Sequence, residues 1–187
     1  MKKILLISLA SLSAFSQTSN IFEPIDVFDL EYVSNPQISP SGDKVLYQRN
    51  FNDIMTDQSF SNIWLIDYDG NNNRPITTGN FKDNSPKWSN QGDKFLFISN
   101  REGKSQIFLF DLNNNSIQKL TNFQYSIESI QWSPNDKYIL FSSFIDSERD
   151  TLIEMPDKPK GAKWNDPPVE ISDLNYRYDS SGFRKPG

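Results

Sequence analysis

The chain has 187 residues, of which 36% are hydrophobic and 13% aromatic, enough apolar material for one compact core and unlike a disordered protein. Its net charge is −5 with no basic stripe, which argues against nucleic acid as a partner. It contains no Cys and no His, so the chain by itself builds no disulfide, no thiolate metal site and no Ser/His/Asp triad. We therefore expect no catalytic, metal-binding or cofactor-binding residue in it.

Residues 1–16 have the three parts of a secretory signal peptide. Two lysines precede an apolar run from Ile4 to Leu12, and Ala14 and Ser16 occupy the small-residue positions of a cleavage site. The apolar run is well short of the ~20 residues that a membrane-spanning helix needs. We predict a cleaved leader and an exported protein, in a bacterial periplasm or outside the cell, with no membrane attachment after cleavage.

A repeat follows the leader. Residues 62–97 and 106–141 superimpose without a gap at a shift of 44. A partial third copy, residues 39–47, aligns with 89–97 and with 133–141, so the first spacing is 50. The identical positions of the longer alignment are, in its first copy, Ile63, Leu65, Asp67, Asn71, Thr77, Ser85, Trp88, Ser89, Leu96 and Phe97.

Each copy has the pattern of short, half-buried strands. Apolar side chains lie two residues apart, as at Ile63 and Leu65 or at Phe108 and Phe110, and turns rich in Asn, Asp and Gly follow. About four short strands in ~44 residues are typical of one blade of a β-propeller. A β-sandwich is the alternative all-β fold, but it does not require a strand–turn–strand pattern to recur at a fixed period.

We predict an all-β, partial β-propeller over residues 17–187, with about three four-stranded blades. Their approximate bounds are 30–80, 81–125 and 126–187, and the last includes an insertion at 155–170. A closed propeller of four to eight such blades needs roughly 180 to 350 residues. We therefore expect an incomplete ring, in which the terminal blades leave strand edges and apolar faces uncovered.

The repeats also resemble a known group. NIWLIDYDGNNNRPIT (62–77) and FISNREGKSQIFLFDL (97–112) look like the propeller repeats shared by TolB and the prolyl oligopeptidase-type serine peptidases. Residues 158–183 resemble an insertion of the acylaminoacyl-peptidase and dipeptidyl-peptidase-like branch, in which an AKW…PP segment precedes an L.YR.DG.GY-like strand. Ser180 and Ser181 depart from that pattern.

This resemblance implies the function of a longer protein. In such peptidases the propeller precedes an α/β-hydrolase domain with a GxSxG nucleophile, an acidic residue and a His. This chain contains neither a GxSxG motif nor a His, so no such set of catalytic residues occurs in it. The resemblance implies an N-terminal propeller portion, inactive alone, that gates peptide access to the hydrolase domain of an exported serine peptidase. The alternative is a TolB-like periplasmic propeller that binds proteins and has no enzymatic activity.

One polar loop superficially suggests a calcium site. Asp67, Asp69, Asn71 and Asn73 place oxygen-bearing side chains at alternate positions around Gly70. However, the glycine is at the fourth position instead of the sixth, and no Glu follows at the twelfth. We expect these residues to form a turn, which Asp and Asn commonly do.

Two further pairs of residues have both a structural and a functional interpretation. Trp88 and Trp132 occupy equivalent places in the repeat, and we favour repeated core packing over stacking platforms for a ligand. Arg101 and Glu102 lie in a predicted tight loop between two strands. There we favour an exposed turn over a contact with a peptide terminus.

Overall fold

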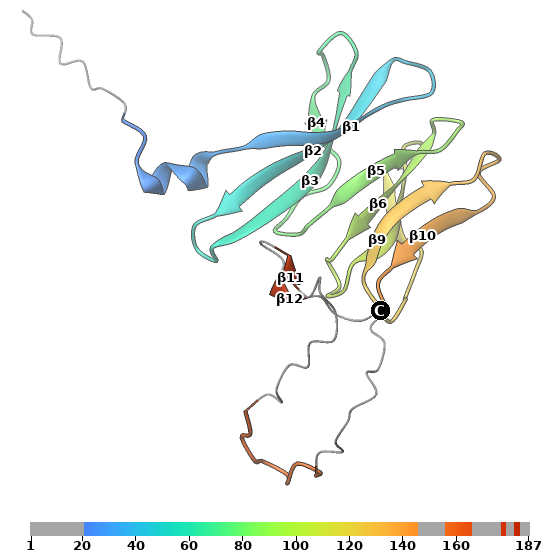
Figure 1. The fold of residues 1–187 in the computed structure, drawn as a ribbon. Helices are drawn as coiled ribbons and strands as arrows, with labels where there is room; N and C mark the ends of the chain where they lie inside the picture. Colours follow the sequence, from blue (N-terminus) through green and yellow to red (C-terminus); the bar gives the residue numbers. More distant parts are fainter. Residues whose placement is uncertain (1–20, 146–155, 166–176, 179–181, 184–187) are drawn as a thin grey trace, which may run out of the picture.

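The computed structural model describes residues 21–145, 156–165, 177–178 and 182–183 (Figure 1). The predicted signal peptide, residues 1–16, lies outside them. The described residues form strands and one short 3₁₀ helix, η1 (Pro24–Asp29), as the all-β prediction requires. No helix within the described ranges is both long and apolar enough to span a membrane.

The first sheet follows η1. It consists of β1 (Tyr32–Ile38), β2 (Lys44–Asp53), β3 (Gln58–Asp67) and β4 (Arg74–Pro75), arranged in chain order and antiparallel. Gly42, with a φ of 77°, lies in the tight turn between β1 and β2. This is a meander of consecutive hairpins, as short strands separated by turn residues predict.

The second sheet repeats this arrangement. Its strands are β5 (Asn84–Trp88), β6 (Lys94–Ser99), β7 (Gln106–Asp111) and β8 (Ser116–Lys119), again antiparallel in chain order. The prediction of four short strands in each repeat is confirmed in both sheets.

The third sheet has two strands among the described residues, β9 (Ile127–Trp132) and β10 (Ile139–Ser143). The pair β11 (Arg177–Tyr178) and β12 (Gly182–Phe183) forms a separate two-stranded sheet. Residues 156–165 of the predicted insertion contain neither helix nor strand. A four-stranded third blade therefore stays a prediction.

The sheets are arranged radially. β1 contacts β5, and β5 contacts β9, so the first strands of the three sheets lie side by side. No contacts join the fourth strands β4 and β8, so the first two sheets converge at their first strands and spread apart toward their last. Figure 1 shows the resulting fan, which is the geometry of consecutive propeller blades.

The core lies between the sheets. Along β6, Phe95 and Phe97 face the first sheet, whereas Leu96 and Ile98 face the third, because successive side chains of a strand point to opposite faces. All four are at most 2% exposed. The middle sheet is thus covered on both faces, which explains its nearly continuous apolar sequence.

The two clusters differ in composition. The first is rich in aromatic rings, with Phe95 stacked on Phe110 at 5.1 Å and Phe97 on Phe108 at 5.6 Å between ring centroids. The second is mainly aliphatic. The buried members of the first cluster are Leu46, Ile63, Leu65, Phe95, Phe97, Phe108 and Phe110. Those of the second are Leu96, Ile98, Ile107, Ile127 and Ile130.

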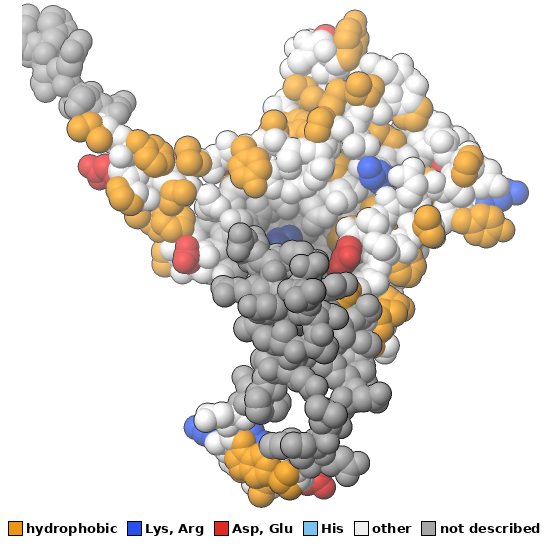
Figure 2. Space-filling view, in the orientation of Figure 1, with side chains coloured by type: hydrophobic (Ala, Val, Ile, Leu, Met, Phe, Trp, Pro, Cys, Tyr) orange, Lys and Arg blue, Asp and Glu red, His pale blue; other side chains and the backbone are white. Residues whose placement is uncertain are grey.

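Apolar side chains are exposed at both ends of the fan, around η1 and on the third sheet (Figure 2). Ile25 and Leu30 at the first end are 53% and 50% exposed, and Tyr138 and Leu140 at the other end are 71% and 75% exposed. The uncovered apolar surface predicted for the terminal blades is therefore present among the described residues.

The SPSGDK-type segments form a turn that recurs between copies of the repeat. The Ser39 hydroxyl accepts a hydrogen bond from the Lys44 backbone N–H at 3.1 Å and donates to the Asp43 carboxylate at 2.9 Å. The same two contacts recur 50 residues later in the turn between β5 and β6. The recurring serine and aspartate thus satisfy the turn's own polar groups.

Candidate functional site

The first strands β1, β5 and β9 lie side by side, and we call the described residues that line the grooves beside them the inner wall. Two grooves border these strands. The larger, of about 570 Å³, is lined by residues of all three strands and of β10. The smaller, of about 360 Å³, lies between the first and second sheets. The grooves share Asn35 and Ser85, so they adjoin.

The repeat places polar side chains at two positions of every inner strand in the larger groove. Shifts of 50 and 44 residues relate the members of each row to one another. One row is Asn35, Ser85 and Ser129, and the other is Gln37, Lys87 and Gln131. These positions do not belong to the apolar clusters, so the repeat specifies two polar rows in the groove as well as a core.

Backbone irregularities shape this wall. The β1–β2 register shifts between Ser34 and Gln37, and the β5–β6 register shifts between Asn84 and Lys87. Within the shifts, Asn35 and Ser85 adopt left-handed φ values of 50° and 54°. A bulge of this kind leaves one residue out of the ladder and bends the strand, which turns both residues into the grooves that they line.

The smaller groove is dominated by uncharged polar groups. Its side-chain amides come from β1, β2 and β5, and its hydroxyls come from Tyr32 and from Ser59, Ser61 and Ser85. The Asn35 amide donates to Gln48 Oε1 at 2.8 Å, so part of this layer is preorganised. The amide residues are Asn35, Gln48, Asn50, Asn52 and Asn84.

Two lysines are the cations of the wall. Lys82 lines the smaller groove and Lys87 the larger. Neither ammonium group forms an ion pair with any described residue. Among the described residues that line the two grooves there is no Asp or Glu. The arrangement offers hydrogen bonds and positive charge to a bound molecule.

Arg101 lies in the predicted turn, but its side chain is not free. Its Nη2 donates to Asp83 Oδ2 at 2.9 Å, and its guanidinium lies 5.1 to 5.5 Å from the ring centroids of Phe81, Phe97 and Phe108. The expectation of an exposed turn is wrong for Arg101, which is 19% exposed, and correct for Glu102. The Arg101 guanidinium is therefore not free to bind a peptide terminus.

Asp83, the partner of Arg101, was not singled out in the sequence. Its side chain is fully buried, and its Oδ1 has no hydrogen-bond partner among the described residues. The Asp83 backbone also bridges the sheets, because its N–H donates to the Ser61 carbonyl at 2.9 Å and its carbonyl accepts from the Ser61 hydroxyl at 2.9 Å. This buried ion pair is thus next to the contact between the first and second sheets.

A signal for this ion pair exists in the repeat. At shifts of 50 and 44, the equivalent positions hold Val33 and Phe51 in the first sheet, and Ile127 and Ile145 in the third repeat. Two charged residues of opposite sign therefore replace an apolar pair in the second repeat alone of the three. A comparison of the copies position by position would have found them.

Trp88 and Trp132 are core residues that join neighbouring sheets. Trp88 packs against the first cluster, and its indole N–H donates to the Gln37 carbonyl at 3.0 Å. Trp132 packs against the second cluster and donates to the Lys87 carbonyl, also at 3.0 Å. The acceptors are themselves equivalent in the repeat, so the prediction of repeated core packing is confirmed.

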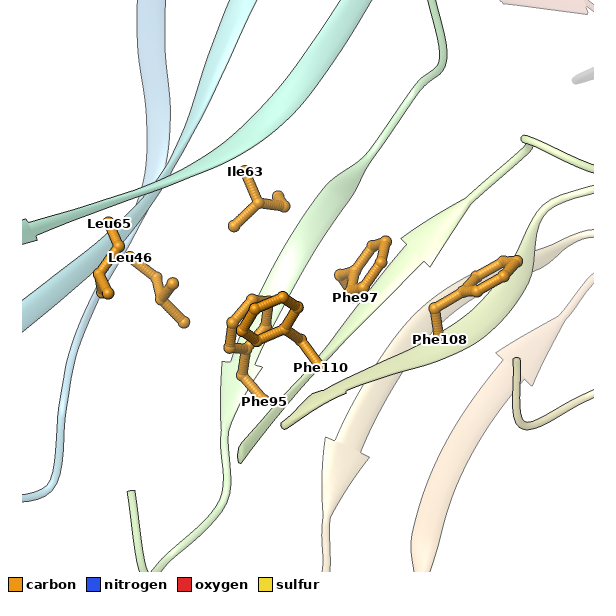
Figure 3. Packing of buried hydrophobic residues seen from close by; sticks show 7 residues of the cluster. All are labelled: Leu46, Ile63, Leu65, Phe95, Phe97, Phe108 and Phe110. Carbon is orange, nitrogen blue, oxygen red and sulfur yellow. The ribbon is translucent and has the colours of Figure 1, made fainter. Parts of the chain in front are cut away.

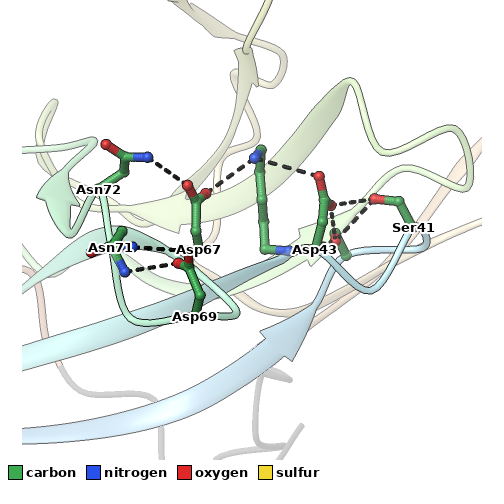
Figure 4. A network of polar contacts seen from close by, with 8 residues as sticks. Ser41, Asp43, Asp67, Asp69, Asn71 and Asn72 are labelled. Atoms are coloured by element: carbon green, nitrogen blue, oxygen red, sulfur yellow. Dashed lines mark hydrogen bonds and ion pairs between the residues drawn. The ribbon is translucent and has the colours of Figure 1, made fainter.

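The loop after β3 is a polar turn whose side chains bond to one another and to residues of β2 (Figure 4). Asp67 accepts hydrogen bonds from Asn72 at 2.6 Å and from Lys44 Nζ at 3.1 Å, and these lower its pKa. Asp69 accepts from the Asn71 backbone and side chain, which lower its pKa as well. The predicted turn role of these residues is confirmed.

The remaining two residues of this loop fit the same interpretation. Gly70 has a φ of 85°, which favours glycine, and Asn73 Oδ1 accepts a hydrogen bond from the Tyr47 hydroxyl at 2.8 Å. That the loop binds no metal stays a prediction.

The radial sheets and their polar inner wall define a β-propeller domain. The family model of the TolB β-propeller domain matches residues 30–158, and the chain belongs to that family. The predicted resemblance to TolB-like propellers of the peptidase branch is also confirmed by its relatives, named below.

Two curated relatives are peptidases by name. Dipeptidyl-peptidase 5 of Porphyromonas gingivalis is 34% identical over 166 residues, which cover 89% of this chain and 24% of that protein. The uncharacterized peptidase YuxL of Bacillus subtilis is 27% identical over 161 residues, covering 86% and 24%. The chain thus spans about a quarter of the length of these relatives.

A solved structure shares the fold. The acylaminoacyl peptidase of Pyrococcus horikoshii superimposes with a TM-score of 0.60 at 19% identity, over 83% of this chain and 22% of that one.

Figure 3 shows the first cluster described above, in which aromatic rings of the second sheet meet aliphatic side chains of the first.

Proposed function

We propose that the chain is the N-terminal propeller portion of an exported serine peptidase, and that its inner wall contacts peptides on their way to a separate α/β-hydrolase domain. The observation that carries this proposal is the similarity to dipeptidyl-peptidase 5, which extends over 89% of the chain. The polar inner wall supports it further, because it offers contacts to a passing chain.

The catalytic residues of such an enzyme would be supplied by other segments. The sequence contains no His, so it lacks the general base of a Ser/His/Asp triad. The curated relatives are about four times as long as the matched region, which leaves room in them for a hydrolase domain. By itself, the chain would be inactive.

The third sheet supports the presence of a further sheet beside it. Leu46, Leu96 and Leu140 are equivalent in the repeat, and the first two face the next sheet and are 0% exposed, whereas Leu140 is 75% exposed. Gln131 holds the position whose carbonyl accepts the tryptophan N–H in the two preceding sheets. A fourth sheet with a tryptophan equivalent to Trp88 and Trp132 would cover the Leu140 side chain and donate to the Gln131 carbonyl.

The chemistry of the wall suits passage more than tight capture. Amides and hydroxyls exchange hydrogen bonds with peptide groups at a net gain of about 1 kcal/mol each, because water competes for the same groups. Specific pockets for small ligands are mostly apolar with few polar groups. The larger groove combines its polar rows with apolar side chains such as Ile130 and Leu140, so it offers both kinds of contact to many sequences and limits access by width and charge.

The test begins with the reading frame that contains the chain. We expect an in-frame α/β-hydrolase domain after the propeller, with GxSxG, an acidic residue and a His in that order. The purified full-length product should be labelled by a fluorophosphonate probe and should hydrolyse short peptides faster than folded proteins. A reading frame without such a domain would contradict the proposal.

Export has its own test. A fusion of residues 1–40 to alkaline phosphatase, which is active only after export, should be active in a bacterial host. Replacing the two leader lysines and interrupting the apolar run with charged residues should abolish that activity. A fusion that stays inactive with the natural leader would contradict export.

The second candidate is a TolB-like propeller that binds proteins and has no enzymatic activity. The observation that favours it is the family match itself, which covers residues 30–158 and carries no catalytic element. In this case the full reading frame would contain a closed propeller that ends without a hydrolase domain, and fluorophosphonate would not label the product.

A further inference from the structure

The inner wall and the rest of the molecule differ in charge. The chain carries 24 acidic and 19 basic residues. The residues that line the two grooves include Lys82 and Lys87 and no carboxylate among the described residues. An acidic protein thus has a positively charged inner wall, which is a pattern that favours an anionic ligand.

These two lysines differ from others in the sheets. Lys44 pairs with Asp67 at 3.1 Å and Lys119 with Glu102 at 2.6 Å. No described side chain neutralises Lys82 or Lys87 in this way. Because both groups border hollows between the sheets, their field acts on whatever enters those hollows.

Two acidic residues in or directly beside the inner strands do not line the grooves. Asp83, which lies directly after Lys82, is fully buried and paired with Arg101. Glu128 belongs to the inner strand β9, but it lines neither groove. Every side-chain amide of the smaller groove already donates a hydrogen bond within the chain, so the two lysines are the groups that attract a carboxylate.

We infer that the inner wall binds peptides through a carboxylate, either an acidic side chain or the C-terminal group, with Lys82 and Lys87 as its cations. This inference rests on the proposed function and adds a substrate class to it: anionic peptides. Since both lysines are partly exposed, each ion pair contributes modestly, roughly two- to fivefold in affinity. Steering by the positive wall also makes binding dependent on salt.

The experiment uses the full 187-residue chain and rhodamine-labelled heptapeptides of Gly and Ser. Three amidated peptides carry three Glu, three Gln or three Lys residues, and a fourth carries three Gln and a free C-terminus. Fluorescence anisotropy at low salt should rank Glu above Gln by about fivefold and Lys last. The difference should shrink at 0.5 M salt, where the screening length falls below about 5 Å. The fourth peptide separates binding of a C-terminal carboxylate from that of a side chain.

Matched variants locate the effect. Lys82→Gln and Lys87→Gln should each weaken binding of the Glu peptide about two- to fivefold and leave the Gln peptide unchanged. Lys137→Gln is the control, because it removes the same charge from an exposed residue in the turn between β9 and β10 that lines neither groove.

The outcomes separate this inference from the proposed function. Equal affinity for all the peptides overturns carboxylate selection but leaves peptide passage intact. An equal loss in Lys137→Gln overturns it too, since bulk charge then explains the ranking. If no peptide binds at all, the inference fails together with the proposed contact between the wall and peptides, whereas the labelling test of the hydrolase domain still stands.

Discussion

The second and third sheets have equivalent residues in very different surroundings. Leu96 is 0% exposed, whereas its counterpart Leu140 is 75% exposed. The difference does not come from the side chains, which are identical in type. It comes from the neighbours: the second sheet lies between two others, and one face of the third is uncovered among the described residues. Burial in a repeat protein is thus a property of the stack.

The two covered interfaces also differ. Between the first and second sheets there are aromatic rings and the buried pair of Asp83 and Arg101, whereas the second and third sheets meet mainly through aliphatic side chains. An ion pair present at one interface and absent from the equivalent place at the other makes the sheets non-interchangeable.

The largest effect should come from breaking this ion pair. Asp83→Ala leaves the guanidinium of Arg101 largely buried without its carboxylate, and we expect a loss of about 3–5 kcal/mol in the free energy of unfolding. The measurement is urea denaturation followed by tryptophan fluorescence.

The double variant Asp83→Ile with Arg101→Ile installs the residues found in the third repeat. It should recover most of that stability, because an apolar pair of suitable volume replaces a buried ion pair at little cost. A double variant no more stable than Asp83→Ala would show that the ion pair does more than fill this position.

The comparison of the two leucines is tested by one substitution at both sites. Leu96→Ala should cost about 2–5 kcal/mol, because it opens a cavity in the second cluster. Leu140→Ala should stay within about 0.5 kcal/mol, since its side chain is already largely in water. Urea midpoints of the two variants give the answer directly, and equal losses would mean that the third sheet is covered in solution.

The bonds between sheets should have a smaller effect. Trp132→Phe keeps an aromatic ring but removes the N–H that reaches the Lys87 carbonyl, at a cost of about 1 kcal/mol. Trp164→Phe is the matched control, because Trp164 is 45% exposed. Hydrogen exchange of β9 amides should quicken in Trp132→Phe and not in the control. Unchanged exchange would argue against a role for this bond in docking the third sheet.

The smallest effect concerns pH. Hydrogen bonds from Ser41 and Ser39 lower the pKa of Asp43 from 3.8 to about 2. Because the folded value is the lower one, the ionised carboxylate stabilises the fold above pH 3.8, and this contribution is lost as the pH falls toward 2. Asp43→Asn should reduce the fall of the urea midpoint across this range. The second sheet has Gln91 in place of Ser41, so Asp93→Asn is the comparison.

Much of the fold could be predicted from the sequence because its signals are local. Alternation at Ile63 and Leu65 marks a strand, and the serine, glycine and aspartate of the turns satisfy one another within a few residues. The position of Trp88 and Trp132 in the repeat was enough to predict core packing. The leader and the role of the chain in a longer enzyme stay predictions.

The candidate site was harder to predict. The polar rows of the inner wall contain common residue types, and no single strand shows that Gln37, Lys87 and Gln131 line one groove. Arg101 was expected to be exposed because its own turn is polar. Its partner Asp83 lies 18 residues earlier, directly before β5, and only the docking of rings around the guanidinium explains why both are buried.

The sequence by itself determined the strands, the turns and the repeat, because side-chain alternation and turn chemistry act over a few residues. Only the tertiary structure decided which equivalent leucine is buried, which cations border the grooves and where Arg101 finds its carboxylate. Those outcomes depend on contacts between residues as far as 51 positions apart, such as Trp88 and Gln37, and so on how whole sheets dock.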